Sequence, residues 1–454
     1  MGSSDQHGIP LQLLTEDENM STKQRMKYCG SAEHTTLSRR TFLGATAALA
    51  GGMTGIAGLS NPAVAETIRK NDKRVIMLWL AGGASQLETF DPKPGRPTGG
   101  PYMPIATSVP GVHISELMPK MAARLQKYTA VVRSLNTRDG DHGGGADLMM
   151  HGRKNEPNLK YPDLGAMLAH ELRQADSQVP DYVAIYSQTE GRSNGGLGAG
   201  FLGAPYAPII LNEKMELPFV KRLESITELD HRERADLQKL MSKRFLRGRD
   251  SNSVASHGTA YDRVAGLMAS DKLFDISQEP QKVRDRYGPS LFAQQALIAR
   301  RLVEAGVPFV RVARAWWDSH GQNFETHSEL VPELDHVMST LLDDLEERGL
   351  LENTLVITTA EFGRTPNINA SLGRDHFASA WSSTLSGCGI VPGAVYGETD
   401  ENGNTVKDGE VGAGEFFATV FEALGIKHDH ELYVGARPIP LVNPGIKPIK
   451  EILA

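Results

Sequence analysis

The stretch from Thr354 to Phe377 constrains the fold of this chain more than any other part of its sequence. It begins with Thr-Leu-Val-Ile-Thr-Thr (354–359), which is β-branched or apolar throughout and contains no breaker. Such a run is typical of a strand that is buried on both faces. Polar residues follow at once, beginning with Glu361. Because ligands of open α/β sheets bind at the carboxyl ends of the strands, Glu361 is a candidate site residue.

A second strand and a helix precede this stretch. Residues 307–313 predict a strand, and 328–348 predict an amphipathic helix with leucines spaced three and four residues apart. Strand, helix and strand in succession predict a βαβ unit, whose strands are parallel and whose crossover is right-handed. The loops after both strands should then lie at one edge of the sheet. We therefore expect Asp318 and His320 to lie beside Glu361.

The loop that ends the first stretch carries a second group of polar residues. Asp375 and His376 are adjacent, and both residue types are common ligands of divalent metals. Arg364 and Arg374 flank the loop, and a guanidinium group suits bidentate binding of an anion. The alternative is that one of these arginines forms an ion pair with Glu361 that only stabilises the loop.

Two further segments have the same strand-then-glycine pattern. Residues 74–80 predict a buried first strand that ends at Gly82 and Gly83, where the backbone can turn tightly or approach a ligand. Residues 129–134 predict another strand. The segment 139–153 then contains His142, a run of glycines and an apolar stretch, which indicates the start of a helix. A helix N-terminus offers free N–H groups to an anion.

These elements predict an α/β fold with a mostly parallel sheet sandwiched between helices. From Gln188 to Pro289 the pattern changes to a glycine-rich segment followed by charged helical segments. We interpret 188–289 as a helical insertion or lid on a domain that spans 66–454. Near the predicted site, Trp316 and Trp317 are expected to pack inside the protein, and His327 is expected on a helix surface.

The N-terminal segment, 1–65, has the pattern of a leader. Ser-Arg-Arg-Thr-Phe-Leu (38–43) precedes an Ala/Gly-rich apolar run, and Ala-Val-Ala (63–65) is a small-residue cleavage site. Together they predict a twin-arginine signal peptide and an exported, periplasmic protein. The run is short and interrupted by glycines, so no stable transmembrane anchor is expected. The alternative is an uncleaved N-terminal anchor.

The charge of the chain limits its partners. Its formal net charge is −7, and the leader contains equal numbers of basic and acidic residues, so cleavage leaves this charge unchanged. A mildly acidic surface argues against nucleic acid as a partner. After cleavage Cys388 is the one remaining cysteine, which excludes an intramolecular disulfide.

Four motifs occur in an order that resembles a known family: LAGGASQLETFDPKP (80–94), WDSHGQNF (317–324), TAEFGRTP (359–366) and GRDHF (373–377). The chain resembles the bacterial family called domain of unknown function 1501 (DUF1501). It is similar to a distant branch of the alkaline phosphatase and sulfatase superfamily. The resemblance implies an alkaline-phosphatase-like fold with two metals at the carboxyl edge of a mostly parallel sheet.

The resemblance also implies roles for single residues. Asp318 and His320 match an Asp and a His that bind one metal, Glu361 matches the strand-end Asp of the second metal, and His376 matches a late metal-binding His. Phe362 departs from the pattern, because a His typically follows the strand-end Asp.

Two other positions depart from the superfamily pattern. The first strand lacks a terminal metal-binding Asp, for which Glu88 or Asp91 could substitute. The position of the nucleophile at a helix start carries His142, and no Pro or Arg follows Cys388 at the spacing that formylglycine chemistry requires.

The sequence therefore predicts an exported metal-dependent hydrolase of phosphate or sulfate esters. Its substrate would be a small anionic ester or a polysaccharide, and its divalent metal zinc, manganese or calcium. His142 would act as nucleophile or general acid/base, and Arg364 and Arg374 would clamp the anion. The alternative is a non-catalytic binding or cell-envelope protein that retains the fold. The predicted metal ligands are Asp318, His320, Glu361, Asp375 and His376.

Overall fold

A computed structural model describes residues 72–454 except for 175–176, 178, 186–187, 190–191, 194–196, 213, 216–224 and 248–270. The predicted leader, its twin-arginine motif and the boundary at residues 65 and 66 lie outside the described residues. Among the helices that are described, none combines the length and the apolar character needed to cross a membrane.

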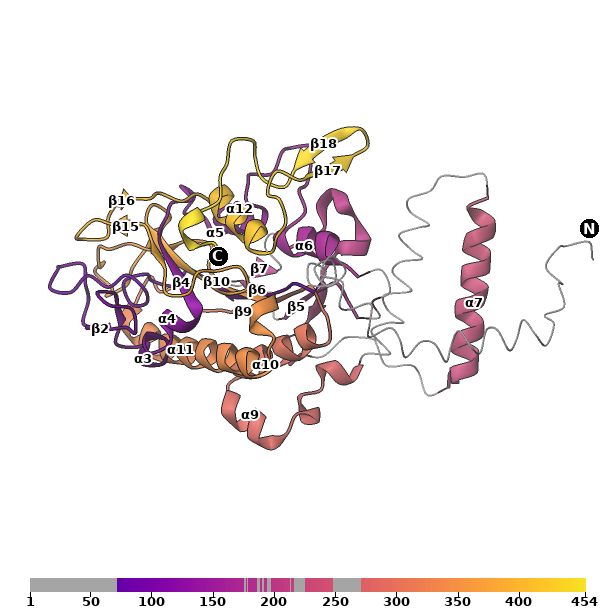
Figure 1. The fold of residues 1–454 in the computed structure, drawn as a ribbon, viewed down its shortest axis with the longest axis horizontal. Coiled ribbons are helices and arrows are strands. Elements are labelled where there is room, and N and C mark those ends of the chain that lie inside the picture. Colours follow the sequence, from indigo (N-terminus) through magenta and orange to yellow (C-terminus); the bar gives the residue numbers. More distant parts are fainter. Residues whose placement is uncertain are drawn as a thin grey trace, which may run out of the picture. The chain divides into compact units, whose positions relative to one another are not determined.

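An eight-stranded sheet forms the centre of the protein, with the strand order β14-β4-β13-β10-β1-β9-β5-β8 (Figure 1). Neighbouring strands are parallel except where β13 pairs with β10 and β4. This confirms the predicted α/β class. The strands are β1 (Arg74–Leu80), β4 (Thr129–Leu135), β5 (Tyr182–Ile185), β8 (Ile209–Leu211), β9 (Phe309–Arg314), β10 (Thr354–Thr359), β13 (Trp381–Gly387) and β14 (Val395–Tyr396).

The strands at the centre of the sheet are the most apolar runs of the sequence. Every residue of β1 and of β10 is buried, as expected for strands covered on both faces. β1 lies between β10 and β9, so the two strands of the predicted βαβ unit are parallel but are not direct neighbours. Their carboxyl ends still reach the same edge of the sheet.

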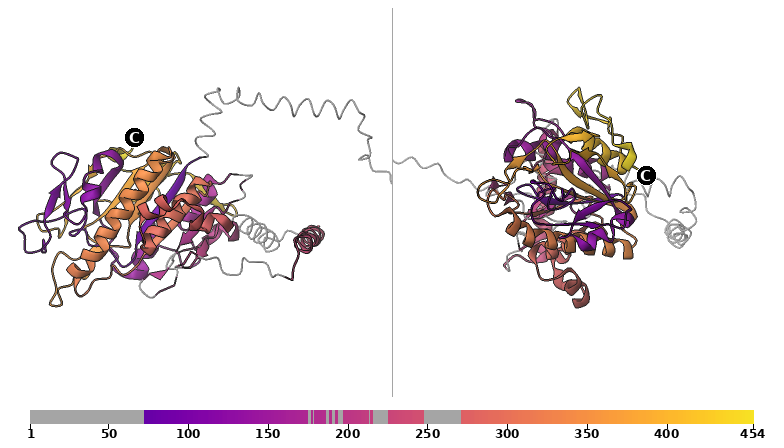
Figure 2. Two further views of the ribbon diagram at one scale, coloured as in Figure 1. Left: turned by 90° about the horizontal axis from the view of Figure 1, so that it is seen from below. Right: turned by 90° about the vertical axis from the view of Figure 1, so that its left-hand side faces the viewer.

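Helices cover both faces of the sheet. On one side α10 (Leu291–Glu304) packs against β9 and β1 and lies beside α11 (Asn323–Glu347), as Figure 2 shows. On the other side lie α5 (His142–His151), α6 (Leu164–Leu172) and α12 (Ala413–Ala423). The sheet is therefore enclosed by two helical layers, as the sequence predicted.

Three elements differ from the sequence-based expectations. Helix α11 begins at Asn323, five residues before the predicted start at 328. The amphipathic segment 117–128, whose sequence favours one continuous helix, is divided into α3 (Pro119–Ala122) and α4 (Leu125–Tyr128). Strand β13 was not predicted, because Trp-Ser-Ser-Thr-Leu-Ser-Gly lacks the apolar run or strict alternation that marks a strand.

The segment 188–289 is not wholly an insertion, since it includes β8, an edge strand of the central sheet. The described parts of this segment also contain a short hairpin and two helices. These are β6 (Gln188–Thr189), β7 (Arg192–Ser193), α7 (Glu228–Phe245) and α9 (Gln281–Tyr287).

The other elements of the described residues are short strands and 3-10 turns. The strands are β2 (Pro104–Ala106), β3 (His113–Ser115), β11 (Gly363–Arg364), β12 (His376–Phe377), β15 (Glu398–Thr399), β16 (Val406–Asp408), β17 (Glu431–Val434) and β18 (Arg437–Pro440). The turns are η2 (Gly200–Leu202), η3 (Ala204–Tyr206), η4 (Asp271–Phe274), η5 (Ile276–Gln278), η6 (Leu351–Asn353) and η7 (Lys450–Ile452).

Candidate metal centre

The loops after β9 and β10 converge at the carboxyl edge of the sheet, as the sequence predicted. Asp318 follows β9, Glu361 follows β10, and both contact the imidazole of His142. The His142 Nε2 atom lies 3.1 Å from Asp318 Oδ2, and Nδ1 lies 3.0 Å from Glu361 Oε1. Three segments that are distant in the sequence thus form one polar cluster.

His142 owes its position to the start of helix α5. The preceding residue, Asp141, caps the helix, and its carboxylate accepts hydrogen bonds from the backbone N–H groups of Gly143 and Gly144 at 2.8 and 3.1 Å. The cap fixes His142 as the first helical residue. Two of the N–H groups that were predicted to receive an external anion are therefore bound to a carboxylate of the protein itself.

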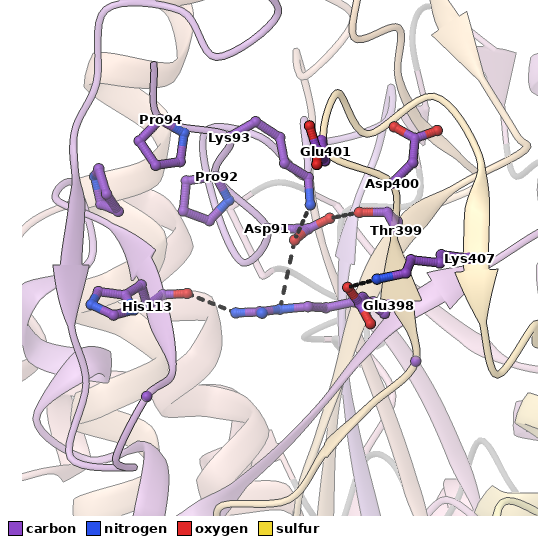
Figure 3. Close-up of a pocket in the computed structure, with 14 residues that line it drawn as sticks. Asp91, Pro92, Lys93, Pro94, His113, Glu398, Thr399, Asp400, Glu401 and Lys407 are labelled. Carbon is purple, nitrogen blue, oxygen red and sulfur yellow. Dashed lines mark hydrogen bonds and ion pairs between the residues drawn. The ribbon is translucent and has the colours of Figure 1, made fainter. Parts of the chain in front are cut away.

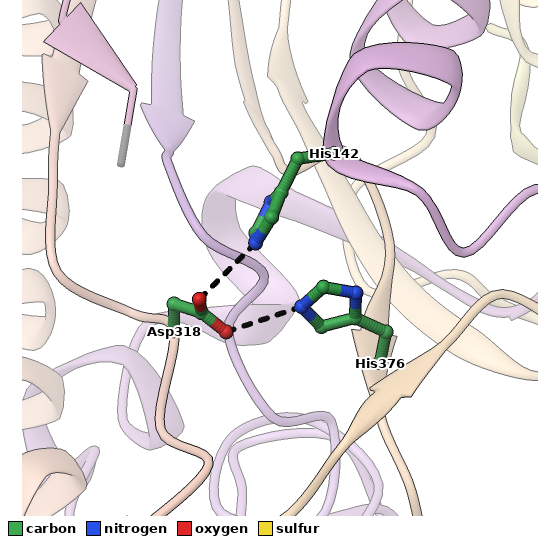
Figure 4. A group of neighbouring side chains, drawn as sticks. All are labelled: His142, Asp318 and His376. Atoms are coloured by element: carbon green, nitrogen blue, oxygen red, sulfur yellow. Dashed lines mark hydrogen bonds and ion pairs between the residues drawn. The ribbon is translucent and has the colours of Figure 1, made fainter. Parts of the chain in front are cut away.

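His376 approaches the cluster from a short antiparallel pair of strands. In this pair β11 and β12 place Arg364 opposite His376. The His376 Nε2 atom lies 3.2 Å from Asp318 Oδ1, and its Nδ1 atom lies 2.7 Å from the carbonyl oxygen of Gly140. Figure 4 shows the rings of His142 and His376 directed at the carboxylate of Asp318 from two sides.

His320 completes the group at its more exposed side. Its Nε2 atom lies 3.2 Å from Asp318 Oδ1 and 3.0 Å from His376 Nε2. Its Nδ1 atom lies 2.7 Å from Asp375 Oδ1. The His320 and Asp375 side chains are 48% and 55% exposed, so this is the side of the cluster that solvent reaches.

The partners of the Nδ1 atoms fix the protonation of the imidazoles. Each Nδ1 contacts a carboxylate or carbonyl oxygen, and these oxygens accept hydrogen bonds. A neutral imidazole in this position carries its proton on Nδ1 and presents the lone pair of Nε2. His142, His320 and His376 therefore direct three Nε2 atoms at one carboxylate. Such a gathering of acceptors requires protons or a metal cation between them.

Protons can supply this positive charge when no metal is bound. Burial lowers the pKa of His142, but hydrogen bonds with Asp318 and Glu361 outweigh this effect and raise the pKa to about 9. Burial likewise raises the pKa of Asp318, but hydrogen bonds from His142 and His376 and the charge of Arg364 hold it well below its ordinary value. The imidazolium of His142 then bridges two carboxylates.

The geometry also fits a metal ion. His142, Asp318 and His376 each offer one ligand atom, and these atoms lie within 4.8 Å of one another. Of the described residues, three predicted ligands lie outside this group: Glu361, Asp375 and His320. The two carboxylates lie behind the imidazoles, on the Nδ1 atoms of His142 and His320. The His320 ring contacts the group through Asp318 and His376. The predicted catalytic residue His142 thus has the position of a ligand. The predicted ligands Glu361 and Asp375 instead support the imidazoles of His142 and His320.

Arg374 does not fit the predicted role of an anion clamp. It is completely buried and binds both oxygens of Glu88, with Nε at 3.1 Å and Nη2 at 2.7 Å. Its other N–H groups donate to the backbone carbonyls of Thr98, Thr365 and Pro366. A guanidinium has five N–H donors, and all five have acceptors here. Arg374 therefore fastens two loops to each other.

Arg364 is also completely buried, which excludes a direct contact with a ligand in solvent. It donates to the carbonyls of Gly82, Gly83 and Arg374, and it contacts Asp318 Oδ1 at 2.6 Å. The alternative ion pair with Glu361 does not form. Arg364 holds the carboxylate of Asp318 in place from behind.

The two residues that could substitute for the missing strand-end Asp are directed elsewhere. Glu88 is engaged with Arg374, as described above. Asp91 lines a separate cavity of about 630 Å³, where it contacts Lys93 and Thr399 (Figure 3). None of the lining residues of this cavity belongs to the cluster around Asp318. Neither carboxylate supplies a ligand to the centre.

Phe362 fills the space beneath the histidines. Its ring centroid lies 5.0 Å from that of His142 and 4.5 Å from that of His376. Gly83 makes room for it, because a Cβ atom at that position would lie 2.8 Å from the Phe362 ring. The position where the resemblance implies a second-metal His is therefore an apolar support for the two ligand rings.

Three predictions about neighbouring residues had different outcomes. Trp317 is buried, as expected, whereas Trp316 is 59% exposed. The prediction of a surface position for His327 was wrong, because it is completely buried and its Nε2 atom accepts the N–H of Ser85 at 3.0 Å. This contact anchors the loop that follows β1.

Sequence comparison assigns the chain to a family. A family model described as "Protein of unknown function (DUF1501)" matches residues 72–453, and the chain belongs to this family. Among curated proteins, no sequence matches the chain.

Several solved structures share the general arrangement. Phosphonate monoester hydrolase SpPMH from Silicibacter pomeroyi is 11% identical, covers 83% of this chain and 76% of its own, and has a TM-score of 0.38. Alkaline phosphatase from the Antarctic bacterium TAB5 is 14% identical, with coverages of 78% and 98% and a TM-score of 0.35. Ps i-CgsB, solved in complex with k-i-k-neocarrahexaose, is 11% identical, with coverages of 78% and 72% and a TM-score of 0.38. These similarities are too low to assign a substrate or a metal to this chain.

Proposed function

We propose that this protein is a metal-dependent hydrolase of phosphate or sulfate esters that acts outside the cytoplasm. The observation that carries the proposal is the arrangement of three imidazole Nε2 atoms around the carboxylate of Asp318, with every Nδ1 atom held by an oxygen acceptor. Export follows from the arginine pair and the cleavage site of the leader.

The residues present fit a metal ion. Histidines that bind metals usually donate their second N–H to a carboxylate or carbonyl, which fixes the ring and increases the basicity of the ligand atom. Glu361, Asp375 and the carbonyl of Gly140 provide these partners for the three histidines. We assign His142, Asp318 and His376 as ligands, with His320 as a further ligand on the exposed side.

The donor set favours zinc over the other predicted metals. Imidazole nitrogen and carboxylate oxygen are common ligands of zinc, and a site with open positions is typical of catalytic zinc. Calcium prefers an all-oxygen environment, which this cluster does not offer. Manganese tolerates mixed ligands and is an alternative outcome of metal analysis.

In this centre a bound metal would polarise an ester oxygen and lower the pKa of a water molecule. Both ring nitrogens of His142 are engaged, by Asp318 and Glu361, so His142 is better suited to hold a ligand position than to attack an ester. We therefore assign the attack to water. Arg364 orients Asp318, and Phe362 excludes solvent from beneath the rings.

The test measures the metal content of the mature protein by mass spectrometry, together with hydrolysis of aryl phosphate and aryl sulfate esters. We expect about one or two equivalents of zinc in the wild type. In Asp318→Asn and in His376→Ala we expect metal affinity weaker by about 100-fold or more, because losing a ligand costs more than losing one of its outer partners. His428→Ala is the matched control, because His428 also contacts a carboxylate, that of Glu422, outside the centre. A protein without metal would overturn the proposal. Bound metal without hydrolysis of any ester would favour the alternative of a non-catalytic binding protein.

A further inference from the structure

The most unusual charge in the interior is Arg311, at the middle of strand β9. The strand is covered on both faces, and Arg311 is 1% exposed. The Nε, Nη1 and Nη2 atoms of Arg311 have no hydrogen-bond partner among the described residues. A buried charge without a partner is costly, and an unsatisfied group of this kind calls for an unseen water molecule or ion.

The register of the sheet locates the guanidinium. Arg311 pairs with Met77 of β1 and Ala184 of β5, and it lies on the same face as Phe309 two residues earlier. Gly165 of α6 packs over Phe309, so this face lies under the α5 and α6 layer. The guanidinium carbon of Arg311 lies 5.1 Å from the centre of the Trp79 ring. Trp79 is two residues closer to the carboxyl edge than Met77.

Two further polar atoms near this position lack a partner. The indole Nε1 of Trp79 and the hydroxyl of Thr359, its partner in β10, are both buried and make no hydrogen bond with the described residues. Glu361 is two residues beyond Thr359, and its Oε2 atom is likewise buried without a partner. Unsatisfied donors and one unsatisfied carboxylate oxygen thus occur in successive rows on one face of the sheet, from Arg311 toward the carboxyl edge.

The charges that act on Arg311 also indicate Glu361 as its partner. Burial lowers the pKa of Arg311, and the charges of Asp163 and Glu361 are among those that partly offset this effect. Both oxygens of Asp163 already accept hydrogen bonds, Oδ1 from Ala166 and Oδ2 from Tyr182 and Gly198. Glu361 uses only Oε1, which binds Gly82 and His142. Its Oε2 atom is the acceptor that remains.

We propose that ordered water molecules enclosed between the sheet and the α5–α6 layer join Arg311 to Glu361 Oε2, and that Arg311 is thereby a positioning residue of the metal centre. Buried water typically makes about three hydrogen bonds to otherwise unsatisfied polar groups, and this face of the sheet offers such groups. Arg311 acts through Glu361, which in turn orients His142. This inference rests on the proposed function, since its consequence is measured as metal affinity.

The test combines metal affinity with a double-mutant cycle. Outer partners of metal ligands typically change affinity about 10- to 100-fold, so we expect Arg311→Met to weaken binding of zinc or cobalt about tenfold and to shift the absorption bands of bound cobalt. Arg311→Lys keeps the charge and should restore most of the affinity. In the Glu361→Gln background, Arg311→Met should cause no further loss, because the residues act in series. Equal, additive losses in both backgrounds would overturn the inference.

Two controls separate this inference from the proposed function. A wild-type protein that binds no metal overturns both, whereas a wild-type protein that binds metal with unchanged affinity in Arg311→Met overturns only the inference. A crystal structure tests the water directly: density that bridges Arg311 and Glu361 supports it. A direct ion pair, or an anomalous bromide signal at Arg311 after a halide soak, contradicts it.

Discussion

A buried arginine lies on each side of the central sheet, Arg300 on helix α10 and Arg311 on strand β9 beneath α6, and the two have very different polar surroundings. In the α10 and α11 layer, Arg300 forms ion pairs with Glu279 at 2.7 Å, with Asp344 at 2.9 Å and with Glu304. Burial lowers the pKa of Arg300, but these carboxylates outweigh it and raise the pKa above the ordinary value. The charge of Arg300 is therefore paired with carboxylates, although its Nε and Nη2 atoms lack hydrogen-bond geometry.

Under the α5 and α6 layer the balance is incomplete. Arg311 makes no hydrogen bond with any residue that the structure describes, and burial lowers its pKa. The centre above it directs three imidazole nitrogens at one carboxylate. The comparison indicates where a ligand binds. Around Arg300 the charged groups of the protein pair with one another, which is typical of a structural role. Near Arg311 the imidazole nitrogens face a carboxylate, and both are acceptors, so a proton or a metal cation is needed between them.

The largest expected effect is a loss of folding stability when Arg300, in the α10 and α11 layer, is replaced. Arg300→Met leaves buried carboxylates without their partner, which typically costs about 3–5 kcal/mol of folding free energy. We expect a loss of about 3 kcal/mol, at the lower end of this range, because Arg301 still contacts Glu279 and Arg348 still contacts Asp344. Chemical denaturation measures this loss, and metal affinity of the folded protein should not change.

Arg311→Met should give the reverse pattern, with weaker metal binding and a smaller loss of stability. If Arg300→Met weakened metal binding as much as Arg311→Met does, the distinction between the two layers would be broken.

The next largest expected effect is a change in metal affinity with pH, of about tenfold per pH unit. In the metal-free protein the pKa of His142 is raised to about 9, so the ring is protonated at pH 7 and must lose a proton to bind a metal. Affinity should therefore increase between pH 7 and 9, with about one proton released per metal. Calorimetry in buffers of different ionisation enthalpy measures the release.

The same pKa predicts the stability of the metal-free protein. Because the folded pKa of His142 is above the unfolded value, its contribution is complete below about pH 6.5 and is lost as the pH rises through about 9. Thermal melting of the metal-free protein should show this decrease, and His142→Asn should remove it. A metal affinity that stays constant between pH 7 and 9 would contradict the assigned protonation.

The sequence predicted the edge of the sheet better than the roles of the residues that gather there. Apolar runs located β1 and β10, and the βαβ rule brought Asp318 and Glu361 together. The roles of these residues were harder to predict, because a role depends on which atoms of the side chain already form hydrogen bonds within the protein. Nothing in the motif GRDHF reveals that Arg374 will use every donor on Glu88 and three carbonyls.

Arg311 shows the same limit for the interior. An arginine within Phe-Val-Arg-Val-Ala-Arg can lie at an exposed edge or at the centre of a sheet, and a strand pattern does not separate these cases. Its burial follows only from the strand order, in which β9 lies between β1 and β5. Strand order depends on contacts between distant segments, which local periodicity does not contain.

The smallest effect tests whether the start of helix α5 belongs to the scaffold or to the centre. Asp141→Ala removes the cap that binds Gly143 and Gly144, which typically costs about 1 kcal/mol of stability. Because the cap also fixes His142 as the first helical residue, we expect metal affinity to fall by a few fold as well. Ser290→Ala is the matched control, because Ser290 caps helix α10 through Ala293 and does not hold a ligand. If both variants lost stability and neither lost affinity, the position of His142 would be set by its contacts with Asp318 and Glu361, and the helix start would be scaffold.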